Sequence, residues 1–155
     1  MKTEKKSPKM NVVNEVSIVY KRILYDEKMR ITSSLDASNI FRKIIDENRI
    51  DYKEIFCVML LSRANQVLGV SEIGSGSTAG VVVNNIEIFQ LAILSNASGI
   101  ILAHNHPSGK LVPSEQDIEC TRKIKEACKL LEIKLVDHII LSSEGHYSFS
   151  DEGLL

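Results

Sequence analysis

The most informative segment of this sequence is AHNHPSGKLVPSEQD, residues 103–117. It overlaps the end of an apolar run, GIILA, that is typical of a short buried strand. Side chains two residues apart in an extended chain point to the same side, so His104 and His106 can converge on one ion. Asp117 can supply a carboxylate from a following helix. Two imidazoles, one carboxylate and an open fourth position are typical of a catalytic zinc site.

Each part of this segment also has an interpretation that needs no metal. Histidine serves as a core or capping residue as well as a ligand, so a His-x-His pair alone is weak support for metal binding. Ser114 and Asp117 match the Ser-x-x-Asp form of a helix capping box, a role that is compatible with ligation. The letters of His104-Asn105-His106 spell HNH, but the nuclease motif of that name is spread over a much longer ββα unit.

The complete pattern consists of His-x-His, seven residues, a serine, two residues and an aspartate. This pattern resembles that of the JAMM or MPN+ metallopeptidase family. AHNHPSG, PSEQD and the later LVDH, residues 135–138, are similar to the RadC branch of that family, whose members are often named DNA repair protein RadC. The resemblance covers about residues 30–155 and implies a JAB/MPN domain with a cytidine-deaminase-like architecture.

The resemblance implies a role for each residue of the pattern. His104, His106 and Asp117 would bind one zinc ion, and Ser114 would donate its hydroxyl to the oxyanion that develops on the substrate. Such an ion lowers the pKa of its water and so generates a nucleophile near neutral pH. The implied activity is the zinc-dependent hydrolysis of an amide bond.

The family pattern also includes a glutamate at the start of a central strand. Glu54 matches it, because it directly precedes the apolar run IFCVMLL. Glu54 would act as general base toward the attacking water and then as general acid toward the leaving amine. Glu72 and Glu87 are the competing candidates. An acidic residue near a helix start, such as Glu87, is favoured by the helix dipole alone and so has an explanation without catalysis.

Asp137 and His138 form a further polar pair next to an otherwise apolar segment. His138 could orient a metal ligand through a hydrogen bond. The alternative is a structural histidine that is buried and hydrogen-bonded, and we favour this second interpretation because buried polar side chains are generally paired.

The rest of the chain predicts an α/β domain with a mixed central sheet and about three flanking helices. β-branched or unbroken apolar runs predict strands, and apolar residues three to four apart predict helices. The expected strands are Val12–Tyr20, Ile55–Leu61, Val67–Ile73, Gly99–Ala103, Leu135–Leu141 and Tyr147–Phe149. The first expected helix is capped by Ser34 or Asp36, the others start at Asn84 or Asn85 and at Ser114, and the three end near Asn48, Asn96 and Leu131.

Length and composition favour one domain, at 11–155, preceded by a disordered basic tail at 1–10. A net charge of -1 and an aromatic content of 5% offer little surface for nucleic acid. The three cysteines are odd in number and lack Cys-x-x-Cys spacing, so neither disulfides nor a cysteine zinc site are predicted. No apolar run approaches the roughly 20 residues that span a bilayer, so we expect a cytoplasmic protein without membrane contact.

The sequence therefore favours a zinc hydrolase that cleaves a peptide or isopeptide bond in a protein or peptide substrate. Two other classes stay open, namely a DNA-processing or repair-associated metalloprotein such as a nuclease, and a non-catalytic MPN interaction module. DNA is weakly supported, because RadC proteins usually carry an N-terminal helix-hairpin-helix-like domain and only about thirty residues precede the similar part here. The oligomeric state is not specified, although edge strands can support a dimer.

Overall fold

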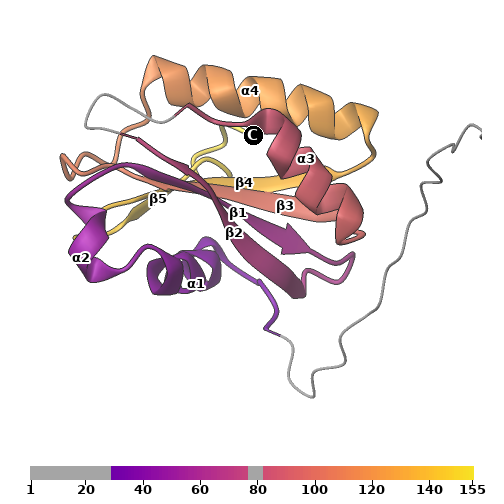
Figure 1. The fold of residues 1–155 in the computed structure, drawn as a ribbon, viewed down its shortest axis with the longest axis horizontal. Helices are drawn as coiled ribbons and strands as arrows, with labels where there is room; N and C mark the ends of the chain where they lie inside the picture. Colours follow the sequence, from indigo (N-terminus) through magenta and orange to yellow (C-terminus); the bar gives the residue numbers. More distant parts are fainter. Residues whose placement is uncertain (1–28, 77–81) are drawn as a thin grey trace, which may run out of the picture.

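The computed structural model of this chain describes residues 29–76 and 82–155. The expected tail and the expected strand at 12–20 lie outside the described residues, so the division into a tail and one domain at 11–155 stays a prediction. The described residues contain no helix that is long and apolar enough to cross a lipid bilayer. The helices are α1 (Ser34–Ile44), α2 (Glu47–Ile50), α3 (Asn85–Leu94) and α4 (Glu115–Leu130), and the strands are β1 (Ile55–Leu61), β2 (Val67–Ser75), β3 (Gly99–Asn105), β4 (Lys134–Leu141) and β5 (His146–Ser148) (Figure 1).

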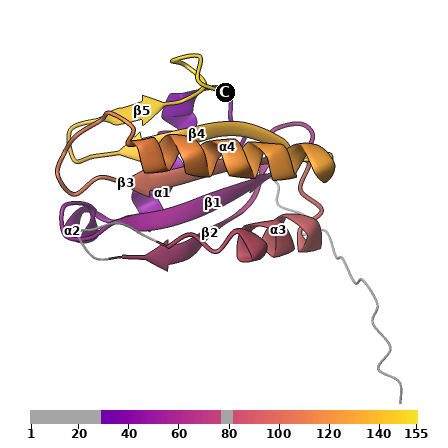
Figure 2. The same cartoon turned by 90° about the horizontal axis from the view of Figure 1, so that it is seen from above.

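The strands form one mixed sheet in the order β2-β1-β3-β4-β5. The pair β3–β4 is parallel, and the other neighbouring pairs are antiparallel. A parallel pair needs a crossover connection, which α4 provides. Figure 1 shows α1 and α2 on one face of the sheet and α3 and α4 on the other, and Figure 2 shows the second face from above. The predicted α/β class with a mixed central sheet is confirmed.

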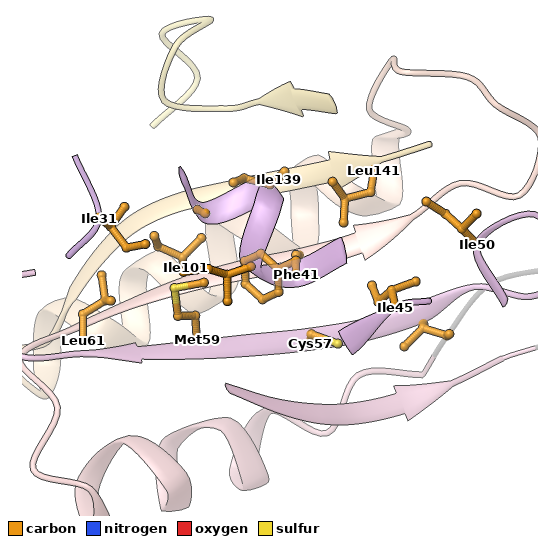
Figure 3. Packing of buried hydrophobic residues seen from close by; sticks show 14 residues of the cluster. Ile31, Phe41, Ile45, Ile50, Cys57, Met59, Leu61, Ile101, Ile139 and Leu141 are labelled. Atoms are coloured by element: carbon orange, nitrogen blue, oxygen red, sulfur yellow. The ribbon is translucent and has the colours of Figure 1, made fainter. Parts of the chain in front are cut away.

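Alternation of side chains explains why IFCVMLL is apolar throughout. Cys57 and Met59 point into a cluster beneath α1 that also contains Phe41 (Figure 3). Val58, between them in β1, and Phe56, just before them, point into a second cluster on the face covered by α3 and α4. Both faces of the central strands are thus covered, and each face takes every second residue. The same alternation in β3 directs His104 toward Phe56 and α4.

Several element boundaries differ from the expected ones for local reasons. α1 is capped by Ser33 and not by Ser34 or Asp36, the two expected caps, and Asp36 completes a capping box with Ser33. The expected helix to Asn48 is interrupted, because the Asp46 carboxylate accepts a hydrogen bond from the Asn48 N–H at 2.7 Å and starts the separate helix α2. β2 and β3 each run two residues further than expected, so β3 includes the first histidine of the motif.

The cysteines are free thiols, as the sequence indicated, at Cys57, Cys120 and Cys128. Burial raises the pKa of the Cys57 thiol to about 12 and that of the Cys128 thiol to about 11. These two thiols therefore stay protonated at neutral pH and pack as small apolar side chains.

Candidate metal centre

Strand β3 and helix α4 bring the three candidate ligands together. His104 is in β3, His106 follows that strand directly, and Asp117 lies in the first turn of α4. His104 Nε2 lies 3.0 Å from His106 Nε2 and 3.1 Å from Asp117 Oδ1. His106 Nε2 lies 3.4 Å from Asp117 Oδ2. The three side chains therefore form a compact group that could hold one metal ion.

The backbone around the motif fixes where each ligand lies. The His106 N–H donates to the Leu141 carbonyl at 2.9 Å, which extends the β3–β4 ladder just past the end of β3. Gly109 has a φ of 78°, and its N–H donates to the His106 carbonyl, so the loop turns back at this position. Ser114 and Asp117 form the expected capping box, in which the Asp117 carboxylate accepts from the Ser114 N–H at 2.6 Å. Capping thus holds the candidate aspartate ligand in place.

The donor atoms of the group suit a zinc ion. The His106 Nδ1–H donates to the Lys110 carbonyl at 2.8 Å, which leaves the Nε2 lone pair directed at the group. Zinc bonds of about 2.0–2.1 Å to imidazole and carboxylate would place tetrahedral ligand atoms about 3.3 Å apart. The two imidazole nitrogens, 3.0 Å apart, are close to that separation, and each lies near one Asp117 oxygen, His104 at 3.1 Å from Oδ1 and His106 at 3.4 Å from Oδ2. The residues present therefore fit a three-ligand zinc site with a fourth position left open.

The charges within the group stabilise one another. Burial alone would raise the pKa of the Asp117 carboxyl, but the neighbouring His104 and His106 side chains and the Ser114 hydroxyl outweigh it and hold that pKa well below its usual range. The hydrogen bond with Asp117 raises the pKa of His106, against the effect of burial. Asp117 is therefore ionised at ordinary pH and attracts a cation, which is either a proton on His106 or a metal ion.

His106 and Asp117 line a cavity of about 600 Å³ that is also lined by Glu54 and Ser114, and the buried His104 is in contact with both His106 and Asp117. Burial raises the pKa of the Glu54 carboxyl, and the nearby His104 offsets part of this effect. The Ser114 hydroxyl donates to Asp117 Oδ2 at 2.7 Å. The structure thus places Glu54 and Ser114 beside the three candidate ligands.

The two competing glutamates lie elsewhere. Glu72 forms an ion pair with Arg49 at 3.0 Å, between β2 and α2. Glu87 lies in the first turn of α3, where its backbone N–H donates to the capping side chain of Asn84. Neither of them lines the cavity that Glu54 lines.

Asn105, which sequence reasoning did not select, holds the segment that carries Glu54. Its buried side chain accepts a hydrogen bond from the Ile55 N–H at 2.8 Å and donates to the carbonyls of Ile50 at 2.6 Å and Lys53 at 2.8 Å. The residue between the two histidines thus connects β3 to the start of β1. Asn105 is a polar residue at an inward-facing position of a buried strand. This signal in the sequence could have identified it, because such a side chain needs hydrogen-bond partners.

The side chains of Asp137 and His138, which are neighbours in sequence, point to opposite faces of the sheet. The Asp137 carboxylate accepts hydrogen bonds from the Ser148 hydroxyl at 2.6 Å and from the Ser150 N–H at 3.0 Å, close to the C-terminus. His138 is fully buried, and its Nε2 lies 2.9 Å from His104 Nδ1. Burial lowers the pKa of His138 well below its usual value. His138 is thus a buried, paired histidine, but its partner is a candidate metal ligand.

Comparison with known proteins agrees with this architecture. The family model described as RadC-like JAB domain matches residues 31–154. A UPF0758 protein of Flavobacterium johnsoniae is 42% identical over 125 residues, which cover 81% of this chain and 53% of that protein. A UPF0758 protein of Thermotoga maritima is 37% identical over 132 residues, which cover 85% of this chain and 60% of that protein. The chain spans little more than half the length of these curated relatives, and it belongs to the RadC-like JAB domain family.

Proposed function

We propose that this chain is a zinc-dependent hydrolase that cleaves a peptide or isopeptide bond. The observation that carries the proposal is the convergence of His104, His106 and Asp117, the last two of which line a cavity that Glu54 also lines. Imidazole and carboxylate donors with an open position are typical of catalytic zinc. When bound, a zinc ion supplies Lewis acidity, which activates water as a nucleophile and polarises a substrate carbonyl.

Glu54 has the environment that a general base in this reaction needs. Its carboxylate lines the cavity, and burial raises its pKa toward neutral pH, which favours reversible proton transfer. We assign to it the acceptance of a proton from the attacking water and the return of that proton to the leaving amine. Both steps use one carboxylate, so Glu54 ends the cycle in the ionised state in which it began.

Ser114 is the proposed donor to the substrate oxyanion. Its hydroxyl lines the cavity and donates to Asp117 Oδ2 at 2.7 Å in this structure. Rotation about the Cβ–Oγ bond would redirect that proton toward a substrate oxygen, while Oγ would still accept from the Asp117 N–H at 3.1 Å and Asp117 would keep its bond to the Ser114 backbone N–H at 2.6 Å. The cap and the oxyanion role are therefore compatible.

The charges around the cavity favour an amide substrate over DNA. The carboxylates of Asp51, Glu54 and Asp117 line it, against the single ammonium group of Lys110. A bound zinc ion of charge +2 would bring this lining close to neutral, but the described lining has only one cationic side chain, whereas several normally neutralise a phosphate backbone. A protein or peptide substrate is therefore the proposed partner, and DNA processing is not favoured by any feature of the described site.

Zinc content and hydrolysis together test the proposal. We expect near-stoichiometric zinc by elemental mass spectrometry in the native protein and in Glu54→Gln, and strongly reduced zinc in His106→Ala and Asp117→Ala. Hydrolysis of peptide and isopeptide-linked substrates should fall at least about 100-fold in Glu54→Gln, because proton transfer by a positioned group contributes that much.

Glu87→Gln is the matched control, since Glu87 lies outside the cavity, and it should retain both zinc and hydrolysis. A folded native protein that takes up no zinc when zinc is supplied would overturn the proposal and favour a non-catalytic interaction module. Equal hydrolysis by native protein and Glu54→Gln would overturn the role of Glu54.

A further inference from the structure

A continuous chain of hydrogen bonds runs behind the candidate metal centre. His104 Nδ1 lies 2.9 Å from His138 Nε2, and His138 Nδ1 lies 2.6 Å from Thr121 Oγ1. The Thr121 hydroxyl in turn donates to the backbone carbonyl of Asp117 at 2.6 Å. The chain therefore starts at one candidate ligand, His104, and ends on the backbone of another, Asp117.

The end of this chain fixes the position of every proton in it. The Asp117 carbonyl can only accept, so the single hydroxyl proton of Thr121 must point to it. Thr121 Oγ1 then has only lone pairs to offer His138, and His138 Nδ1 must carry a proton. Neutral His138 therefore accepts at Nε2, and His104 must donate from Nδ1. The lone pair of neutral His104 is consequently at Nε2, the atom that faces His106 and Asp117.

The surroundings of the His104 and His138 rings offer few other hydrogen-bond partners. His104 and His138 are fully buried, and Thr121 is buried as well. The His138 ring stacks on Phe149 with centroids 4.8 Å apart and planes inclined by 17°, and the His104 ring stacks on Phe56 with planes inclined by 8°. Aromatic faces hold both rings in place and provide no strong acceptor for their N–H groups.

We propose that Thr121 and His138 are positioning residues that set the tautomer of His104 and so keep its Nε2 lone pair available to a metal ion. This inference rests on the proposed metal site. It assigns to a helix hydroxyl and a buried neutral imidazole the task that a carboxylate or a backbone carbonyl commonly performs behind a ligating histidine. Because Thr121 bonds to the Asp117 carbonyl, the same chain also links the two ligands across β3 and α4.

The test is nitrogen-15 NMR of the histidine rings in metal-free protein at about pH 8, above the usual histidine pKa of about 6.5. We expect the Nδ1–H form of both His104 and His138 in the native chain. Thr121→Val removes the hydroxyl at nearly constant volume. His138 should then donate from Nε2 to His104 Nδ1, which moves the His104 proton to Nε2, where it obstructs a metal ion.

Zinc affinity gives the second readout. Thr121→Val should bind zinc about 10- to 100-fold more weakly, in the range found when the partner of a ligating histidine is lost. Thr121→Ser is the matched control, because it keeps the hydroxyl, and both its tautomers and its affinity should stay close to native. Thermal unfolding of each variant verifies that the fold is retained.

The outcomes separate this inference from the proposed function. A native His104 that carries its proton on Nε2 would overturn the inference whatever the zinc content. An unchanged tautomer and unchanged zinc affinity in Thr121→Val would also overturn it. If the native protein shows the expected tautomers but binds no zinc, the hydrogen-bond chain is supported. That result would contradict the proposed hydrolase function and not the assigned tautomers.

Discussion

At the scale of single residues, the candidate centre depends on what the second ring nitrogen of each histidine contacts. His106 donates from Nδ1 to the backbone carbonyl of Lys110, which can only accept. His104 donates from Nδ1 to a side chain, His138, whose own proton depends on Thr121. The tautomer of His106 is therefore set by the main chain. The tautomer of His104 depends on two side chains, His138 and Thr121, so a mutation of either one can change it.

Zinc binding should weaken as the pH falls. The pKa of His106 is raised from its ordinary value of 6.5, chiefly by its hydrogen bond with Asp117, and zinc must displace the proton that this histidine holds. Where His106 is protonated, each unit of pH lost should reduce the apparent affinity by up to about tenfold. Titrations of zinc between pH 6 and pH 8 measure this slope.

In the metal-free protein, the contribution of His106 to the free energy of unfolding should decrease as the pH rises, whereas zinc binding becomes stronger. Because the pKa is raised on folding, that contribution is fully present below 6.5 and is lost as the pH rises through the higher pKa of the folded state. The increase in melting temperature caused by zinc should therefore be larger at pH 8 than at pH 6. His146→Gln changes a histidine outside the group and should keep the same slope, whereas a zinc affinity independent of pH would contradict the prediction.

At the scale of elements, Asn105 connects strand β3 to the turn before β1. Asn105→Ala would leave the Ile55 N–H and the carbonyls of Ile50 and Lys53 without their present partner. An unpaired buried polar group costs about 1–3 kcal/mol, so we expect a loss of roughly 2–4 kcal/mol in the free energy of unfolding. Urea denaturation measures this loss.

A surface asparagine provides the control for this change. Asn48→Ala alters an exposed residue of α2 and should cost less than about 0.5 kcal/mol. Similar unfolding free energies for Asn105→Ala and Asn48→Ala would contradict the role that we give to Asn105. Zinc content should stay near native in Asn105→Ala, while hydrolysis should fall, because the displaced segment carries Glu54.

The elements that carry the ligands could be predicted from local sequence alone. GIILA predicted β3, and the Ser-x-x-Asp pattern predicted the start of α4, because strand patterning and helix capping depend on neighbouring residues. The contacts behind the ligands could not be predicted in this way. The bond between His138 and Thr121 joins residues 17 apart, and that between Asn105 and Ile50 joins residues 55 apart. The first pair depends on how α4 packs on β4 and the second on how α2 lies against the end of β3, which no local pattern specifies.

At the scale of the whole molecule, the sheet is held by two apolar clusters, and the candidate metal centre lies at one end of β3. The first cluster packs α1 against the sheet, and the second packs α3 and α4 against the opposite face (Figures 1 and 3). The two-layer covering of an apolar sheet could be predicted from the unbroken run IFCVMLL. The separate helix α2 could not, because it depends on a single cap at Asp46.

Removal of the metal should lower the stability of this fold without abolishing it, because both apolar clusters form without any ligand from the centre. Zinc at 100 times its dissociation constant would add about 2.7 kcal/mol, which for a domain of this size is roughly 5–10 °C in melting temperature. A chelator should therefore lower the melting temperature by that amount and leave the far-ultraviolet circular dichroism spectrum unchanged at room temperature. Asp117→Ala should not respond to the chelator. Unfolding of the native protein on chelation would instead identify a structural ion, and an identical melting temperature with and without chelator would indicate that no zinc was bound.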